Sequence, residues 1–211
     1  MIIEHKKIAP LIELHRERAI AIRARLHEFS GVPKTEYFYE LAYCLMTPQS
    51  SAVHADHVVS VLKQQKFFEV GFNPEELLRA KESYIRFHKN KAKYLLTIRN
   101  TIDSIVATLS NGSTSFDLRE WLVENVKGLG YKEATHFLRN IGMNGGLAIL
   151  DRHILRNLKR YGAIRSIPAS LSRKRYLFIE RNFNVFSTAV GIPIDELDLL
   201  FWSMETGEIR K

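Results

Sequence analysis

The chain has 211 residues, 45% of them hydrophobic, which is enough to bury one sizeable core or two smaller ones. Its 31 lysines and arginines oppose 23 aspartates and glutamates, so the net charge is +8. Such a surplus indicates a polyanionic partner, although ribosomal and membrane-surface proteins share it. Composition therefore leaves nucleic acid as one candidate partner among several.

A single cysteine, Cys44, excludes an internal disulfide and any cluster or zinc site built from cysteines. Its neighbours are apolar, so we expect a buried thiol. No apolar run approaches the roughly 18 residues of a membrane span. The N-terminus shows no signal-peptide pattern. We therefore expect an intracellular protein without membrane association.

Helical periodicity dominates from the start of the chain. Apolar residues recur at three- and four-residue steps from Ile8 to Phe29, which predicts one face of a long helix. Gly31 and Pro33 end that helix. Further helices are predicted at about 34–46, 51–64, 74–80, 90–110, 116–126, 132–141, 152–161, 171–189 and 193–204.

Two of these helices have expected N-caps, Ser115 and Ser170. No segment alternates polar and apolar residues over a strand's length between turns, so we find no sheet. The chain is predicted to be all-α, with short connections and no internal repeat.

Residues 118–142 predict two helices joined by a glycine hairpin. The first ends near Val126, and the second starts near Lys132. We expect Gly128 and Gly130 to adopt backbone angles that side chains disfavour, and to let another molecule approach the main chain. Leu129 between them is expected to be buried.

Free N–H groups and the helix dipole at the start of the second helix form a phosphate site. The alternative is an ordinary αα-hairpin with a glycine turn. The spacing of Gly128, Gly130 and the small Ala134 favours DNA binding.

Two residues carry the candidate chemistry. Lys132 lies in the first turn of the second helix, where the dipole disfavours its charged form and thus favours a nucleophilic amine. Asp151 follows a Gly145-Gly146 turn and an apolar segment, and as an N-cap it would remain ionised. Taken singly, Lys132 could be a solvated helix lysine and Asp151 a plain helix cap.

Together these features resemble the superfamily of base-excision glycosylases that includes endonuclease III. The segment Val126–Lys132 matches its helix-hairpin-helix with the lysine of lyase-competent members, and Gly145–Asp151 matches its glycine-rich loop and catalytic aspartate. The four-cysteine iron–sulfur cluster of one branch is excluded.

Within that superfamily the chain is most similar, over nearly its whole length, to the second family of 8-oxoguanine DNA glycosylases, found in archaea and some bacteria. The matching segments are Leu45–Ala52, Arg86–Lys91, Gly130–Ala134 and Trp202–Lys211. The last is the most specific, because members of this family end on a lysine that reaches into the base pocket.

The resemblance implies two helical lobes, residues 1–35 with 145–211 and residues 36–144, and an active-site cleft between them. It implies a bifunctional glycosylase and abasic-site lyase of base excision repair. Lys132 would form a Schiff base with the sugar and nick the strand by β-elimination. Asp151 would stabilise the positive sugar and help to deprotonate or orient the lysine.

The implied partner is double-stranded DNA containing 8-oxoguanine, bound by a monomer in the prokaryotic cytoplasm, associated with the nucleoid. No cofactor is required. The resemblance also implies a potassium or sodium ion, shared with a DNA phosphate, on the backbone carbonyls of Glu124, Val126 and Leu129.

The damaged nucleotide must leave the helical stack. Gln49 is the candidate to fill the vacated space, with helix capping as the alternative. Trp202 and Phe87 are the candidates to face the base, with core packing as the alternative. The N7–H that distinguishes 8-oxoguanine needs an acceptor. We expect the C-terminal carboxylate or a backbone carbonyl to supply it, beside the Lys211 ammonium.

Basic residues near these positions are candidates for phosphate contact, although solvated surfaces often carry such charges. They are Arg86, Lys89, Lys91, Lys93, Arg152 and Arg156. His153 has no paired ligands at metal-binding spacing, so we expect it to be structural or to face DNA.

Two other functions remain open at this point. One is a related glycosylase for another lesion, such as an oxidised pyrimidine or adenine opposite 8-oxoguanine. The absent cluster and the Lys211 ending argue against it. The other is a noncatalytic helix-hairpin-helix module, which would form no Schiff base for borohydride to reduce.

Overall fold

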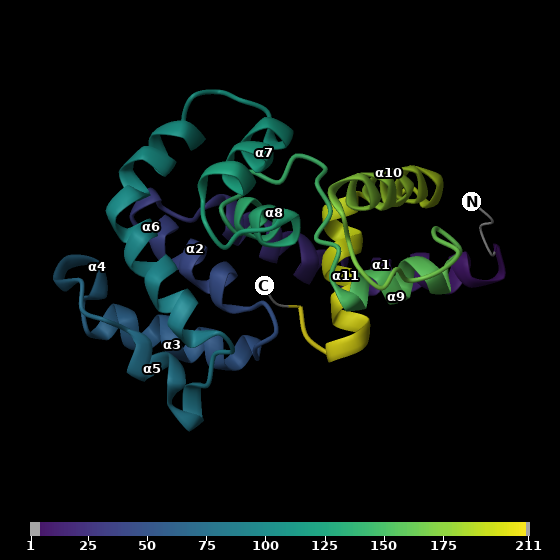
Figure 1. Cartoon of the computed structure of the whole chain (residues 1–211). Coiled ribbons are helices and arrows are strands. Elements are labelled where there is room, and N and C mark those ends of the chain that lie inside the picture. Colours follow the sequence, from purple (N-terminus) through teal and green to yellow (C-terminus); the bar gives the residue numbers. More distant parts are fainter. Residues whose placement is uncertain (1–4, 210–211) are drawn as a thin grey trace. The chain divides into compact units, whose positions relative to one another are not determined.

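The computed structural model describes residues 5–209, with side chains from residue 7 (Figure 1). The chain divides into two compact units. Unit 1 comprises Met1–Gly31 and Gly142–Lys211, and unit 2 comprises Val32–Ile141. The boundaries expected from sequence lie a few residues further along the chain. Residues 5–209 contain helices and no strand, so the all-α prediction is confirmed for them.

Unit 2 is built around α2 (Tyr37–Met46), which packs against α3 (Ala52–Gln64), α6 (His88–Leu109) and α8 (Tyr131–Asn140). Nearly all of α2 is buried, because apolar residues lie on most of its surface and its one charged residue, Glu40, is paired inside. The other elements of the unit are η1 (Lys34–Glu36), α4 (Phe67–Val70), α5 (Glu75–Arg79), η2 (Lys81–Ser83) and α7 (Ser115–Asn125).

Buried polar contacts fix α8 within unit 2. The Asn140 side-chain amide donates to Glu40 Oε2 on α2 at 3.0 Å, and both residues are buried. The guanidinium of the fully buried Arg119 on α7 lies 5.1 Å from the ring centre of Tyr131. These contacts hold the start of α8 against α7 and its body against α2.

Unit 1 contains α1 (His5–Ser30), α9 (Arg152–Arg160), α10 (Arg173–Val190) and α11 (Ile194–Thr206), and α11 packs against the other three (Figure 1). The predicted face of α1 is confirmed, because Leu11, Ala19, Ile22 and Phe29 are buried. The remaining core contains an aromatic cluster among aliphatic side chains, with rings stacked or tilted on one another: Tyr161, Phe183, Phe186 and Phe201.

A polar clamp joins α1 to α11. Buried Glu196 accepts hydrogen bonds from Arg23 Nε at 2.9 Å and pairs with His15 Nε2 at 2.6 Å. Burial alone would raise the pKa of Glu196, but the hydrogen bonds and charges of Arg23 and His15 outweigh it and lower that pKa. The carboxylate is therefore held in its charged form.

The predicted long helices are confirmed with small shifts at their ends, but both expected N-caps were wrong. The hydroxyl of Thr114 accepts the N–H of Asp117, and that of Ser172 accepts the N–H of Arg175. Ser115 already lies within α7, and Ser170 precedes the cap of α10. Among the described helices, none combines the length and apolar character needed to cross a membrane.

Candidate functional site

The hairpin between α7 and α8 is closed by a hydrogen bond from Leu129 N to Val126 O at 3.2 Å. Gly128 has φ +96°, and a Cβ atom there would lie 2.5 Å from Tyr94 Cδ2 and 2.8 Å from Leu45 Cδ1. A side chain is therefore excluded by conformation and by space. Leu129 is buried, as predicted.

Gly130 corrects one expectation, because its φ of −99° is ordinary extended backbone. It is the N-cap of α8, and its N–H donates to Glu133 Oε2 at 3.2 Å. A Cβ atom on Gly130 would lie 3.0 Å from that same oxygen. The small residue accordingly allows the Glu133 carboxylate to fold back and cap the helix.

Lys132 lies in the first turn of α8, as predicted, and its side chain is 27% exposed. Its Nζ is 3.3 Å from Glu133 Oε1, so one carboxylate both caps α8 and faces the lysine amine. Sequence reasoning gave Glu133 no role. Its position three residues after the N-cap is the spacing of a capping box, and that signal could have found it.

Strained backbone marks two of the predicted DNA contacts in unit 2. Within residues 5–209, the non-glycine residues with positive φ are Gln49 (56°), Phe87 (61°) and Lys66 (51°). Gln49 is exposed on the partly buried loop of residues 47–51, and Phe87 is the N-cap of α6. Left-handed backbone at bulky residues is costly, and such strain concentrates where side chains meet ligands.

The alternatives for these two residues fit poorly. Phe87 is 50% exposed, so it does not pack in the core. Within the described part of the chain, the Gln49 side chain makes no hydrogen bond to a helix end, and Ser51 is the N-cap of α3. Both side chains are thus presented to solvent.

The basic residues beside Phe87 fall into two groups. The side chains of Arg86 and Lys89 are exposed, and the Arg86 guanidinium lies 5.0 Å from the Phe87 ring centre. Lys91 is buried, at 5% exposed, and its Nζ donates to two backbone carbonyls. The expectation of a phosphate contact at Lys91 is therefore wrong, because its ammonium does not reach the surface.

In unit 1, Asp151 is the N-cap of α9, as predicted. Its Oδ1 accepts the backbone N–H groups of His153 at 2.7 Å and Ile154 at 2.8 Å. Within residues 5–209 no hydrogen bond reaches Oδ2. The carboxylate is held by one oxygen, and the other remains available.

The loop that leads into Asp151 is fastened to α10. The N–H of Ala148 donates to the buried Glu180 Oε1 at 2.8 Å, and Asn184 Nδ2 donates to Gly146 O at 3.2 Å. Sequence reasoning missed these positioning residues. They lie more than 30 positions from the loop, and no local spacing indicates them.

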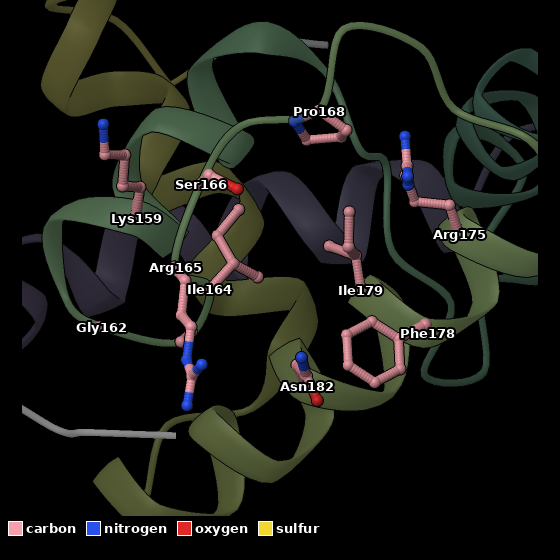
Figure 2. Close-up of a pocket in the computed structure, with 11 residues that line it drawn as sticks. Lys159, Gly162, Ile164, Arg165, Ser166, Pro168, Arg175, Phe178, Ile179 and Asn182 are labelled. Carbon is pink, nitrogen blue, oxygen red and sulfur yellow. The ribbon is translucent and has the colours of Figure 1, made fainter.

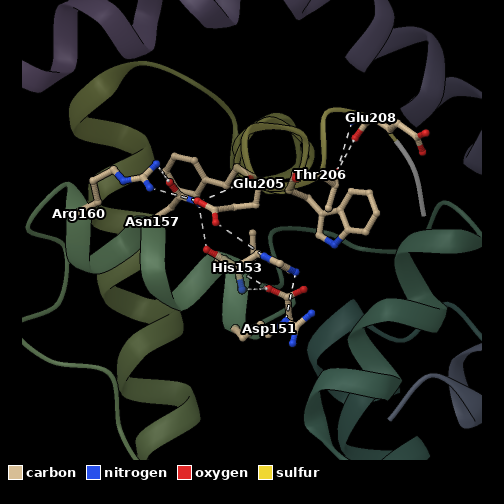
Figure 3. A network of polar contacts seen from close by, with 11 residues as sticks. Asp151, His153, Asn157, Arg160, Glu205, Thr206 and Glu208 are labelled. Atoms are coloured by element: carbon tan, nitrogen blue, oxygen red, sulfur yellow. Dashed lines mark hydrogen bonds and ion pairs between the residues drawn. The ribbon is translucent and has the colours of Figure 1, made fainter. Parts of the chain in front are cut away.

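A polar network along α9 links it to α11 (Figure 3). Glu205 accepts from Asn157 Nδ2 at 3.3 Å and pairs with Arg160 Nη2 at 3.3 Å. His153, whose backbone N–H donates to Asp151, also meets Trp202 with its ring, edge to face at 6.3 Å between ring centres. The structure thus brings Asp151, His153 and Trp202 together within unit 1.

The remaining predicted residues of this unit are less informative. Arg152 is exposed, and its Nε lies 3.3 Å from His153 Nε2. Trp202 is partly exposed. Lys211 lies outside the residues that the structure describes.

Comparisons with known proteins decide the family. The family profile for 8-oxoguanine DNA glycosylase matches residues 22–192. An 8-oxoguanine DNA glycosylase/AP lyase of Fusobacterium nucleatum is 38% identical over 94% of this chain and 95% of its own length. The chain belongs to the 8-oxoguanine DNA glycosylase family.

Other family members agree along the whole chain. The Korarchaeum cryptofilum 8-oxoguanine DNA glycosylase/AP lyase is 40% identical over 90% of both chains. A crystal structure of the Methanocaldococcus jannaschii 8-oxoguanine glycosylase/lyase with a 15-mer DNA containing 8-oxoguanine has a TM-score of 0.86 at 33% identity, covering 98% of this chain and 100% of that one. The predicted family, all-α fold and enzyme class, a DNA glycosylase with AP lyase activity, are confirmed.

Unit 1 of this family member also contains a hollow of about 1060 Å³ beside α9 and α10. Figure 2 shows Lys159, Arg165 and Arg175 around it, together with Phe178. Neither Asp151 nor Trp202 lines this hollow. It is therefore distinct from the polar network that links α9 to α11.

Proposed function

We propose that this chain excises 8-oxoguanine from double-stranded DNA and then nicks the abasic strand, with Lys132 as nucleophile and Asp151 as the catalytic carboxylate. The observation that carries the proposal is the placement of Lys132 in the first turn of α8, directly after the hairpin. The free N–H groups there favour a DNA phosphate, and the same turn carries the amine.

In the first step the neutral Lys132 amine attacks C1′ of the sugar, and the bond from C1′ to the base breaks with its electron pair leaving on the base. The lysine must lose a proton. Glu133 Oε1, 3.3 Å from Nζ, is the acceptor that the structure places beside it. Ring opening then breaks the C1′–O4′ bond and gives a Schiff base. In β-elimination a C2′ proton is lost and the C3′–O bond breaks, so the downstream strand leaves with a 5′ phosphate.

Asp151 supports this step by charge. Positive charge develops on the sugar as the base departs, and a fixed carboxylate stabilises it without having to reorganise. Two backbone N–H groups fix Oδ1 of Asp151, and the second oxygen has no hydrogen-bond partner in the described part of the chain. We assign this second oxygen to the sugar.

The remaining side chains handle the DNA. Gln49 fills the space that the extruded nucleotide leaves, and Trp202 and Phe87 face the base. Exposed basic side chains contact phosphates: Arg86, Lys89 and Arg152.

Lys211 and the terminal carboxylate discriminate 8-oxoguanine from guanine through the N7–H. Deleting Lys211 should therefore reduce the preference for 8-oxoguanine. An unchanged preference would contradict the assignment.

The hairpin carbonyls of Glu124, Val126 and Leu129 are assigned to a potassium or sodium ion. Val126 O accepts one hydrogen bond, from Leu129 N, and a carbonyl oxygen has a second lone pair for a cation. When bound, the ion would attract a DNA phosphate. Replacing potassium and sodium by a bulky organic cation at constant ionic strength should weaken DNA binding.

We further propose that the protein acts as a monomer, in the prokaryotic cytoplasm and at the nucleoid. The net charge of +8 supports an association with DNA. Sedimentation of the free protein and of its DNA complex tests the monomer.

Borohydride trapping tests the central assignment. Wild-type protein should be trapped covalently on duplex DNA containing 8-oxoguanine, and Lys132→Gln should not. Lys81→Gln, which removes an exposed lysine from unit 2, is the matched control and should be trapped like the wild type. An adduct that persists in Lys132→Gln would refute Lys132 as nucleophile.

A further inference from the structure

Lys91 is the buried lysine that the proposed chemistry does not use. It lies in the first turn of α6, is 5% exposed, and donates from Nζ to Met46 O and Pro48 O, each at 2.8 Å. A buried ammonium is costly unless its donors are satisfied. Of its two acceptors, Met46 is the last residue of α2 and Pro48 lies in the 47–51 loop.

The 47–51 loop is fastened to the start of α6 at a second point. Ser50 Oγ accepts the backbone N–H of Arg86 at 2.9 Å and donates to Pro48 O at 3.4 Å. The backbone N–H of Lys91 in turn donates to Phe87 O at 3.0 Å. Lys91 and Ser50 therefore tie the loop to the segment that carries Phe87.

Gln49 lies between these two tethers. Its neighbours are Pro48, whose carbonyl Lys91 holds, and Ser50, whose N–H donates to Thr47 O at 3.1 Å. Its own φ of 56° is left-handed, which a glutamine adopts only when its surroundings enforce it. The tethers on both sides provide that enforcement.

We propose that Lys91 is a positioning residue, whose side chain holds the 47–51 loop so that the exposed Gln49 is presented to DNA in a fixed, strained conformation. The inference rests on the proposed role of Gln49 in filling the space of the extruded nucleotide. It replaces the phosphate contact that the sequence suggested for Lys91.

The charge state of Lys91 is compatible with this role. The pKa of Lys91 is lowered to about 8, mainly by burial; the charge of Glu133 raises it and that of Lys132 lowers it. At pH 7 the side chain is therefore mostly an ammonium, with three N–H donors. Two of these N–H groups donate hydrogen bonds to the carbonyls of Met46 and Pro48.

The step that depends on Gln49 is the extrusion of the damaged base, whereas the lyase step on an abasic site has no base to extrude. Loss of the Lys91 tether should therefore slow excision more than strand nicking. A general loss of structure would slow both, and so would a direct effect on Lys132.

The experiment compares single-turnover excision of 8-oxoguanine with nicking of preformed abasic DNA. The variants are Lys91→Met, Gln49→Ala, the double variant and the control Lys81→Met, in which an exposed lysine of unit 2 is lost. Lys91→Met should slow excision about tenfold and nicking less than about twofold. The double variant should be no slower than Gln49→Ala, because two residues that act through one contact are not additive.

Three results would overturn the inference: equal losses of excision and nicking in Lys91→Met, additive losses in the double variant, or no loss of excision in Lys91→Met when Gln49→Ala is slow. If Gln49→Ala excises 8-oxoguanine like the wild type, both the proposed role of Gln49 and this inference fail. The role of Lys132 is tested separately, by borohydride trapping.

Ser50→Ala provides a second test that leaves the buried charge in place, should Lys91→Met not fold. It removes the other tether, and excision should fall about threefold with nicking unchanged. Unchanged excision in this variant would also overturn the inference.

Discussion

Asp151 allows the structural and chemical contributions of one carboxylate to be separated. Its Oδ1 accepts two backbone N–H groups at the start of α9, at 2.7 and 2.8 Å. Asparagine can accept the same bonds through its side-chain oxygen, whereas alanine cannot. Asp151→Asn and Asp151→Ala therefore remove the same negative charge but differ in the helix cap.

The magnitudes follow from those contacts. Asparagine caps a helix about as well as aspartate, so the unfolding free energy of Asp151→Asn should stay within about 0.5 kcal/mol of the wild type. Alanine should cost about 1 kcal/mol. Both variants lose the charge that faces the sugar, and losing one preorganised electrostatic contact of this kind slows the chemical step about 100- to 1000-fold.

Urea denaturation and single-turnover excision of 8-oxoguanine measure the two effects on the same proteins. We expect Asp151→Asn to be folded and nearly inactive, and Asp151→Ala to be equally inactive but less stable. Activity in Asp151→Asn within about threefold of the wild type would refute a catalytic charge. The helix cap would then be the whole function of Asp151.

Three further predictions concern the supports of the site. Gly128→Ala should lose about 2 kcal/mol or more of stability by urea denaturation, because the new methyl group would clash with Tyr94 and Leu45 in addition to straining the backbone. Gly112→Ala, where φ is also positive but the space is open, should lose only about 1 kcal/mol, and equal losses in the two variants would contradict the packing argument. Glu196→Gln should cost about 2 kcal/mol at pH 7. Because its pKa is lowered in the folded state from 4.5, that difference should be fully present above pH 4.5 and disappear as the pH falls through the lowered pKa; a difference that persists in acid would contradict it. Trp202→Ala should weaken binding to 8-oxoguanine DNA about tenfold while binding to undamaged DNA stays unchanged, and equal weakening on both would contradict a base contact.

Much of the fold was predictable because long amphipathic helices show apolar residues at a helical period in the sequence. The apolar stripe of α1 is an example, and its residues Leu11, Ala19, Ile22 and Phe29 are buried. The short helices α4 and η2 were missed, since elements of three or four residues contain too few turns to show a period. The N-caps of α7 and α10 were predicted wrongly because neighbouring serines and threonines are equally good cap residues, and the sequence does not show which one is used.

The site was predictable where its geometry is local. Lys132 and Asp151 each lie at a helix start that was predicted from a preceding glycine turn, and the structure confirms both helix starts. The positive φ of Gln49 and Phe87 has no such local signal, because neither residue type favours it.

By itself, then, the sequence determined the helices, the hairpin and the two residues proposed for chemistry, since each depends on neighbours within a few positions. Only the tertiary structure decided that Lys91 is buried. Its carbonyl partners, Met46 and Pro48, lie 45 and 43 positions away, and the packing of α2 against α6 brings them to its ammonium. Along the chain Lys91 is one basic residue among several, and burial is a property of the fold, because it depends on which distant segments cover a side chain.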